Sequence, residues 1–227
     1  MFYIVATPIG NLEDITYRAL RVLREVDLIL AEDTRITKRL LDRYNIQAEM
    51  LSYHHHSNQK KIDQIAELIK QGKNLALVTD AGTPGISDPG NKLIHELIEK
   101  FGNSLEIVPI PGPSALTAAL SISGFPTDKF IFLGFVPHKK GRNKFLQEVL
   151  DSQRTVVFYE SCHRIIKCLE QMIEASKTSE TGKISKQIVV CRELTKKFES
   201  IYRGTVDQVL EKVKDDPLKG EYTIMVN

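Results

Sequence analysis

Short runs of apolar and β-branched residues alternate with amphipathic stretches along the whole chain. The apolar runs have the length of buried strands, and the stretches between them repeat apolar residues at the period of a helix. The predicted strands are residues 2–6, 27–31, 75–80, 105–110, 130–135, 155–159, 187–192 and 222–226. The predicted helices are residues 17–26, 34–43, 60–71, 89–101, 114–123, 141–150, 162–175 and 206–214. This order predicts an α/β fold whose first half forms a mostly parallel sheet covered by helices.

A Pro-Gly-Pro cluster at residues 111–113 interrupts the alternation, which then starts again. Proline ends a strand and also fits the first turn of a helix. We therefore expect two α/β lobes, formed by residues 1–111 and 112–227. The polar segment 177–186 is expected to be a solvent loop.

Composition is that of an ordinary folded protein, with 42% hydrophobic and 26% charged residues. No apolar run approaches the roughly 18 to 20 residues of a bilayer-spanning helix, so we expect a cytoplasmic protein with no membrane partner. The three cysteines, Cys162, Cys168 and Cys191, lack CxxC spacing, which favours reduced thiols over a disulfide or zinc site. A net charge of +2 does not by itself indicate a nucleic-acid partner.

Three segments rich in glycine and proline follow predicted strands, where open α/β sheets bind their ligands. They are TPIGNL at residues 7–12, DAGTPGISDPG at 80–90 and PGPSA at 111–115. Glycine lets a ligand approach the backbone, and proline reduces the entropy lost on binding, so these loops suit a flat nucleoside. The sequence lacks GxGxxG, GxxxxGK[ST], GxSxG and HExxH. Their absence disfavours common dinucleotide enzymes, P-loop enzymes and serine hydrolases.

Two polar groups near strand ends are further candidates. The run His54, His55 and His56 invites a metal interpretation, but neighbouring residues on a strand point alternately and no carboxylate or cysteine stands at ligand spacing. We expect no metal and a surface or substrate-contacting role instead. Arg35 follows Asp33 at a predicted helix start. Acidic side chains interact favourably with the helix dipole at this end, whereas an arginine does not, so Arg35 is a functional candidate.

Basic residues gather in the second half of the chain, close in sequence to Phe135, His138 and Tyr159. Cations that hold phosphates and rings that stack on bases are what single-stranded RNA binding requires. The basic residues are Lys139, Lys140, Arg142, Arg164, Arg192, Lys196 and Lys197.

Six segments in this order also resemble a known family. They are AxPIGNLxDIT at residues 6–16, AEDTR at 31–35, DAGTPxxxDPG at 80–90, PGPSA at 111–115, FYESxHR at 158–164 and RELTKxxE at 192–199. The set is similar to that of the tetrapyrrole methylase superfamily and, more closely, of the ribosomal RNA small subunit methyltransferase I family. The resemblance runs from residue 2 to the end of the chain.

The resemblance implies a two-lobed α/β fold, usually homodimeric, that binds S-adenosylmethionine in the cleft between the lobes. It implies 2′-O-methylation of a cytidine ribose in small-subunit (16S) ribosomal RNA, either free or in the assembling subunit. Residues 1–111 would supply the glycine and proline loops, and residues 112–227 would complete the cofactor cleft and face the RNA. Family members commonly continue into a basic helical tail, whereas this sequence stops at Asn227, which bears on RNA affinity more than on cofactor binding.

Site residues follow from the matching positions and from the chemistry. The cofactor contacts implied are Pro8, Asp80, Ala81, Gly82, Thr83, Ile86, Ser114, Ala115, Tyr159, Glu160 and Leu194. The catalytic candidates are Arg35, Glu193 and Lys196. We expect Arg35 and Lys196 to hold phosphate while a carboxylate takes the hydroxyl proton. The candidates for the base are Glu193, Asp33, Lys196 and His54.

Two other functions stay open. The first is methylation of a small, precorrin-type tetrapyrrole by the same fold. The second is an RNA-binding or assembly module without chemistry. The basic clusters and the AEDTR and FYESxHR segments favour RNA as substrate, and the intact glycine and proline loops favour chemistry because a pure RNA binder does not need them.

Overall fold

The computed structural model describes residues 1–178 and 186–227, which divide into two compact α/β units, Met1–Ser114 and Ala115–Asn227. The sequence placed the division after Pro111. In the structure the whole Pro-Gly-Pro cluster belongs to the first unit, and the second unit begins with a helix. None of the helices in the described residues combines the length and apolar character that a bilayer-spanning helix needs.

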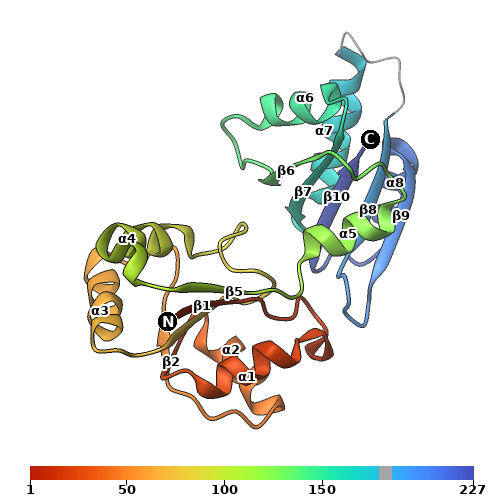
Figure 1. The fold of residues 1–227 in the computed structure, drawn as a ribbon. Coiled ribbons are helices and arrows are strands. Elements are labelled where there is room, and N and C mark those ends of the chain that lie inside the picture. The colour runs from red at the N-terminus through yellow and green to blue at the C-terminus, as the bar shows by residue number, and fades with distance from the viewer. Residues whose placement is uncertain (179–185) are drawn as a thin grey trace. The chain divides into compact units, whose positions relative to one another are not determined.

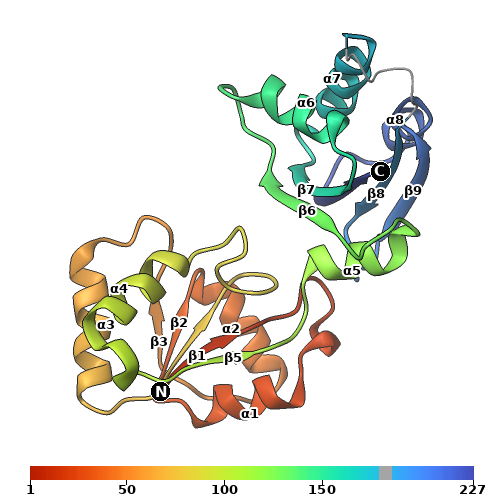
Figure 2. The ribbon, with the colours of Figure 1, turned by 45° about the horizontal axis from the view of Figure 1, so that its top comes forward.

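The first unit is built on a five-stranded parallel sheet in the order β3-β2-β4-β1-β5 (Figure 2). Its strands are β1 (Phe2–Val5), β2 (Leu28–Ala31), β3 (Met50–Ser52), β4 (Leu75–Val78) and β5 (Ile107–Ile110). Each neighbouring pair is parallel, so all five carboxyl ends lie at one edge. The sequence predicted four of these strands and missed β3, which has only three residues, none of them fully buried.

Two helices cover each face of this sheet (Figure 1). They are α1 (Tyr17–Glu25), α2 (Thr34–Arg43), α3 (Gln59–Lys70) and α4 (Asn91–Phe101), with short 3-10 turns η1 (Leu12–Asp14) and η2 (Gly102–Ser104). Helices α1 and α2 pack on one face, and α3 and α4 pack on the other. Thr16, Asp33 and Asn58 cap α1, α2 and α3 with their side chains, which is why these helices begin where they do.

The second unit is built on a mixed five-stranded sheet in the order β6-β7-β10-β8-β9. Its strands are β6 (Phe130–Phe135), β7 (Thr155–Ser161), β8 (Gln187–Arg192), β9 (Ser200–Thr205) and β10 (Glu221–Val226). Only β6 and β7 are parallel. Central β10 pairs Glu221 with Ser161 and Tyr222 with Arg192, so the ends of β7 and β8 flank its start.

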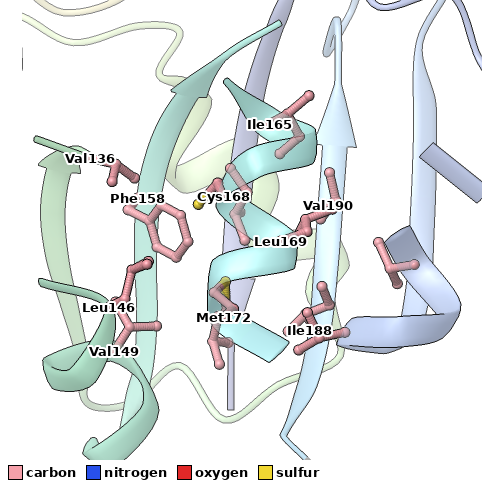
Figure 3. Close-up of a cluster of buried hydrophobic side chains, with 14 of the residues drawn as sticks. Val136, Leu146, Val149, Phe158, Ile165, Cys168, Leu169, Met172, Ile188 and Val190 are labelled. Atoms are coloured by element: carbon pink, nitrogen blue, oxygen red, sulfur yellow. The ribbon is translucent and has the colours of Figure 1, made fainter. Parts of the chain in front are cut away.

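Three helices of this unit pack on one face of its sheet, and α5 (Ala115–Ser123) lies against β10 and β7. The three are α6 (Arg142–Asp151), α7 (Ile165–Thr178) and α8 (Val206–Lys214). Figure 3 shows the core they form: Leu169 and Met172 of α7 lie between Phe158 of β7 and Val190 of β8. Phe158 also meets Phe145 edge to face, with ring centroids 5.5 Å apart.

Two sequence-based expectations for local structure were wrong. His54, His55 and His56 lie in an exposed turn after β3 and not on a strand. Lys177 and Thr178 belong to α7, because the helix runs further than its predicted end at residue 175. The part of the predicted polar loop at 179–185 lies outside the described residues.

Candidate functional site

The loops after β1 and β4 are joined at the carboxyl edge of the first sheet. Thr7 N–H donates to Gly82 O at 2.8 Å, and Gly82 N–H donates to Thr7 O at 3.0 Å. The Thr7 hydroxyl also donates to Thr79 O at 3.0 Å. Gly82 has a φ of +87°, and a Cβ there would lie 3.4 Å from Ile9 Cγ2. A Cβ at position 82 would therefore touch Ile9 at ordinary van der Waals distance, while the positive φ would strain the backbone of any residue other than glycine.

The loop after β5 joins the same assembly. The Thr83 hydroxyl donates to Pro113 O at 3.2 Å. Gly112 packs so closely on the first loop that a Cβ there would lie 3.1 Å from Ala6 Cβ. The three glycine and proline loops predicted from sequence thus come together in one hydrogen-bonded edge. Of the predicted cofactor contacts in this unit, Pro8 and Gly82 are buried, Asp80, Ala81, Thr83 and Ser114 are half-buried, and Ile86 is exposed.

Carboxylates line the neighbouring ends of β2 and β4. Glu32 Oε2 accepts from the Thr79 hydroxyl at 2.7 Å, and Asp80 Oδ1 accepts from Asp33 N–H at 3.0 Å. Burial raises the pKa of the Asp80 carboxyl, and the nearby charges of Glu32 and Asp33 raise it further. Glu32 was not among the predicted site residues. It was missed because its contact with β4 is tertiary and leaves no local pattern.

Arg35 is held at the start of α2 by Asp33. The Asp33 carboxylate accepts from Arg35 N–H at 2.8 Å and from the guanidinium Nη2 at 2.5 Å. These bonds hold the pKa of Asp33 well below its usual range, so Asp33 is a weak base. The Arg35 side chain is 86% exposed, and its guanidinium is accessible to an anion in solution.

His54 is exposed, and its Nδ1 accepts from His56 N–H at 3.2 Å. Within residues 1–178 and 186–227, no three side chains of His, Cys, Asp and Glu gather as metal ligands.

Tyr159 and Glu160 at the end of β7 have opposite environments. The half-buried Tyr159 ring meets Phe132 and Phe135 edge to face, with centroids 5.0 and 5.3 Å away. The Glu160 side chain is 0% exposed and forms ion pairs with Arg142 at 3.2 Å and Arg164 at 2.7 Å. Its carboxylate therefore has no exposed oxygen to offer a ligand.

Glu193 and Lys196 form a compact ion pair after β8. Lys196 Nζ donates to Glu193 Oε1 at 2.8 Å and to Glu221 Oε2 at 3.3 Å. Glu193 Oε1 also accepts from Glu221 N–H at 3.1 Å. Glu193 and Thr195 adopt left-handed φ values of +52° and +64°, which are rare for residues other than glycine. Such strain persists only where surrounding contacts over-determine it, and it is common at functional sites.

The contacts of this pair also shift the pKa of each group. Burial alone would raise the pKa of Glu193, but the bonds from Lys196 and Glu221 N–H outweigh it and lower the pKa. Burial alone would lower the pKa of Lys196, but Glu193 and Glu221 outweigh it and raise the pKa. Neither group is suited to remove a hydroxyl proton, while Lys196 remains a fixed cation. Leu194 between them is buried.

The basic residues of the second unit fall into two classes. Arg142, Arg164 and Arg192 hold the fold together; Arg192, for instance, donates to Lys219 O at 3.0 Å and pairs with Asp216 at 3.2 Å. Lys139, Lys140 and Lys197 are exposed. Phe198 is also exposed, at 66%, and the Lys197 ammonium lies 5.5 Å from its ring centroid.

Comparison with known proteins extends the pattern found in the sequence. The model of the family described as Tetrapyrrole (Corrin/Porphyrin) Methylases matches residues 1–210. A protein of Thermotoga maritima named Ribosomal RNA small subunit methyltransferase I is 43% identical over 99% of this chain and 96% of its own length. A protein of the same name from Escherichia coli O157:H7 is 44% identical over 99% of this chain and 76% of its own length.

Solved structures share the fold at low identity. A cobalt precorrin-4 methyltransferase, CbiF, has a TM-score of 0.73 with 19% identity and covers 100% of this chain and 94% of its own. A uroporphyrin-III C-methyltransferase from Thermus thermophilus, complexed with S-adenyl homocysteine, has a TM-score of 0.65 with 15% identity over 99% of this chain and 96% of its own. Because the family model covers most of the sequence and the relatives above match nearly all of it, this chain belongs to the tetrapyrrole (corrin/porphyrin) methylase family.

Proposed function

We propose that this protein transfers a methyl group from S-adenosylmethionine to the 2′-hydroxyl of a cytidine ribose in small-subunit ribosomal RNA. The observation that carries methylation of small-subunit ribosomal RNA is the 43% identity over 99% of the chain to a protein named as a small-subunit ribosomal RNA methyltransferase. The 2′-hydroxyl of a cytidine is what the resemblance of the sequence motifs implies. The joined loops at the carboxyl edge of the first sheet support the cofactor half of the proposal. The exposed lysines of the second unit support the RNA half.

The residues at the carboxyl edge of the first sheet fit the cofactor. S-adenosylmethionine supplies an electrophilic methyl group on a sulfonium. Its adenosine needs main chain that approaches it closely and acceptors for its ribose hydroxyls. Gly82 offers backbone without a side chain, and the half-buried Asp80 carboxylate is an acceptor for a hydroxyl. We assign the cofactor contacts of this unit to Pro8, Asp80, Ala81, Gly82, Thr83, Ile86 and Ser114. Those of the second unit are assigned to Ala115, Tyr159, Leu194 and the main chain of Glu160, because the Glu160 carboxylate is buried.

Positioning is the main task of the remaining residues, because an in-line methyl transfer loses most of its barrier when the two reactants are correctly oriented. We assign phosphate binding to Arg35, which is exposed, and to Lys196, whose pKa is raised. Glu193 then orients Lys196. The lowered pKa values of Asp33 and Glu193 and the raised pKa of Lys196 argue against the general-base role considered for these residues.

Calorimetric titration with S-adenosylmethionine tests the cofactor half. Gly82→Leu should abolish binding, because the side chain meets Ile9 and the junction with Thr7 shifts. Gly72→Leu is the matched control, since Gly72 has a similar φ of +82° but no atom within 4 Å of its Cβ position. If Gly82→Leu still binds S-adenosylmethionine, the assigned site is wrong. If the wild type does not bind S-adenosylmethionine, either by itself or with RNA present, the proposed activity is wrong.

Analysis of the product tests the RNA half. Small-subunit RNA is incubated with wild-type protein and methyl-labelled cofactor, and its nucleosides are separated. We expect label in 2′-O-methylcytidine. Label in a methylated base, or in another nucleoside, would contradict the proposed specificity while leaving RNA methylation in place.

Methylation of a small tetrapyrrole is the second candidate, and the description of the matching family model, Tetrapyrrole (Corrin/Porphyrin) Methylases, favours it. The likeness to a cobalt precorrin-4 methyltransferase, at 19% identity, concerns the fold alone. Incubation with a porphyrinoid and labelled cofactor discriminates between the candidates. Transfer to the porphyrinoid with none to RNA would reverse our choice.

A further inference from the structure

The ion-pair network around Glu160 reaches beyond its own strand. Arg164 Nη1 donates to Val136 O at 3.0 Å, and Arg142 Nη1 donates to Pro137 O at 3.3 Å. Arg142 Nε also donates to Gln171 Oε1 at 2.6 Å. One buried carboxylate thus fixes two guanidinium groups, and these hold the main chain that follows β6.

The main chain held in this way carries a short basic turn. His138, Lys139 and Lys140 are exposed. Arg142 N–H donates to Lys139 O at 3.3 Å, and Gly141 adopts a φ of +87° that lets the chain turn into α6. In the part of the chain that the structure describes, no ion pair neutralises the Lys139 or Lys140 ammonium. We call residues 136–142 the basic turn.

The network beneath the basic turn adds positive charge to it. Two guanidinium groups face one carboxylate, which leaves an excess of one positive charge. Arg142 Nη2 is buried and has no hydrogen-bond partner among the described residues. Salt screens buried charge less than exposed charge, so this excess reinforces the field of the lysines above it.

We propose that the basic turn binds the phosphate backbone of the substrate RNA, and that Glu160 is a positioning residue that sets its shape. This inference rests on the proposed function, because it takes RNA as the substrate. The sequence suggested Arg142 and Arg164 as phosphate contacts. In this proposal they instead hold the main chain of the basic turn through Pro137 O and Val136 O. Lys139 and Lys140 make the contacts, which are independent of base sequence.

The ion-pair network makes contacts that stability of the fold alone does not require. A buried ion pair is often no more stable than well-packed apolar residues, so its presence is weak evidence for a purely stabilising role. Here both arginines end on carbonyl oxygens of the basic turn. Removing the negative charge at Glu160 leaves the buried Arg142 and the half-buried Arg164 without a counter-ion, so the two cations repel each other and their contacts with the carbonyl oxygens are weakened.

The test uses the whole protein and a fluorescent single-stranded RNA with a small-subunit sequence, titrated at several salt concentrations. Lys139→Ala with Lys140→Ala removes two exposed charges without touching the core. We expect its dissociation constant to rise roughly tenfold near 0.1 M salt and its salt slope to fall by about 1.4, at about 0.7 for each phosphate contact. Lys167→Ala with Lys212→Ala, two exposed lysines on α7 and α8, is the control and should bind like wild type.

Glu160→Gln keeps the side-chain volume and removes the charge. We expect the KM for RNA to rise severalfold, and to change more than either kcat or the affinity for S-adenosylmethionine. Weaker cofactor binding with unchanged KM for RNA would overturn the positioning role. If Glu160→Gln does not fold, Arg164→Lys tests the same link, because it keeps the ion pair and loses the bond to Val136 O.

The outcomes separate this inference from the proposed function. Wild-type affinity and salt slope in the double-lysine variant would overturn the basic turn as the RNA contact, even if wild type methylates RNA. A wild type that binds no RNA would overturn both. If the double-lysine variant binds RNA like wild type but no longer self-associates in sedimentation, the inference is overturned. The basic turn would then contact an acidic surface on a second copy of this chain.

Discussion

Gly220 is the position where one methyl group has the clearest consequence. Its φ is +88°, and a Cβ there would lie 2.2 Å from Glu193 Cδ, far inside van der Waals contact. Gly220→Ala therefore forces the Glu193 side chain to rotate away from Lys196 and from Glu221 N–H. Gly124→Ala is the matched control, because Gly124 has a φ of +76° and no atom within 4 Å of its Cβ position.

The magnitude follows from two contributions. Both variants place an L-residue in the left-handed region, which costs about 1–2 kcal/mol of unfolding free energy. Gly220→Ala also breaks two hydrogen bonds to a charged group, each worth roughly 1.5–3 kcal/mol when fully buried. Glu193 is partly exposed, so water replaces part of that loss, and we expect Gly220→Ala to cost about 1–3 kcal/mol more than Gly124→Ala.

Urea unfolding followed by circular dichroism measures both costs. Glu193→Ala combined with Gly220→Ala closes the double-mutant cycle, since without the carboxylate the new methyl meets no obstacle. The combined variant should be more stable than the sum of the single changes predicts. The reasoning is refuted if Gly220→Ala and Gly124→Ala differ by less than about 0.5 kcal/mol or if the cycle shows no coupling.

Three further outcomes follow from burial and capping. Iodoacetamide at pH 8 should alkylate the half-buried Cys162 of the native protein but not Cys168 or Cys191, because burial raises the pKa of these two thiols to about 12. Modification of all three cysteines, measured by mass spectrometry, would contradict this. Burial also raises the pKa of Tyr222 to about 12. As pH rises, the unfolded chain therefore loses the protons of Tyr222, Cys168 and Cys191 before the folded protein does, and the unfolding free energy should fall between about pH 9 and pH 12. An unfolding free energy that stays constant over this range in urea titrations would contradict the prediction. Thr205→Ala removes the capping box of α8 and should lower stability by about 1 kcal/mol in the same assay, and no change would show that the cap is dispensable.

Local signals in the sequence were strong enough to predict most elements. Helix α2 has the predicted bounds because Asp33 caps its start and its apolar residues keep the helical period. Strand β9 was missed because its sequence, SIYRGT, mixes polar residues and a glycine and has no apolar run. The three joined loops were predictable as well, because glycine and proline at strand ends are visible in the sequence.

Partners that come from distant segments were not predictable. Glu160 was interpreted as a cofactor contact from its motif, yet Arg142 and Arg164 surround its carboxylate. Glu193 and Lys196 were interpreted as catalytic, but Glu221 and Gly220, which fix them, lie on and beside β10. No periodicity in a single sequence reveals that β10 separates β7 from β8.

The position of β10 has a consequence for synthesis of the second unit. Residues 221–226 lie between β7 and β8, and without them the sheet consists of two unconnected pairs of strands. Nascent residues 115–220 therefore expose the apolar edges of β7 and β8 until β10 has left the ribosome. Completion of this sheet must wait for β10, whereas all five strands of the parallel sheet lie within residues 1–114, which are synthesised first.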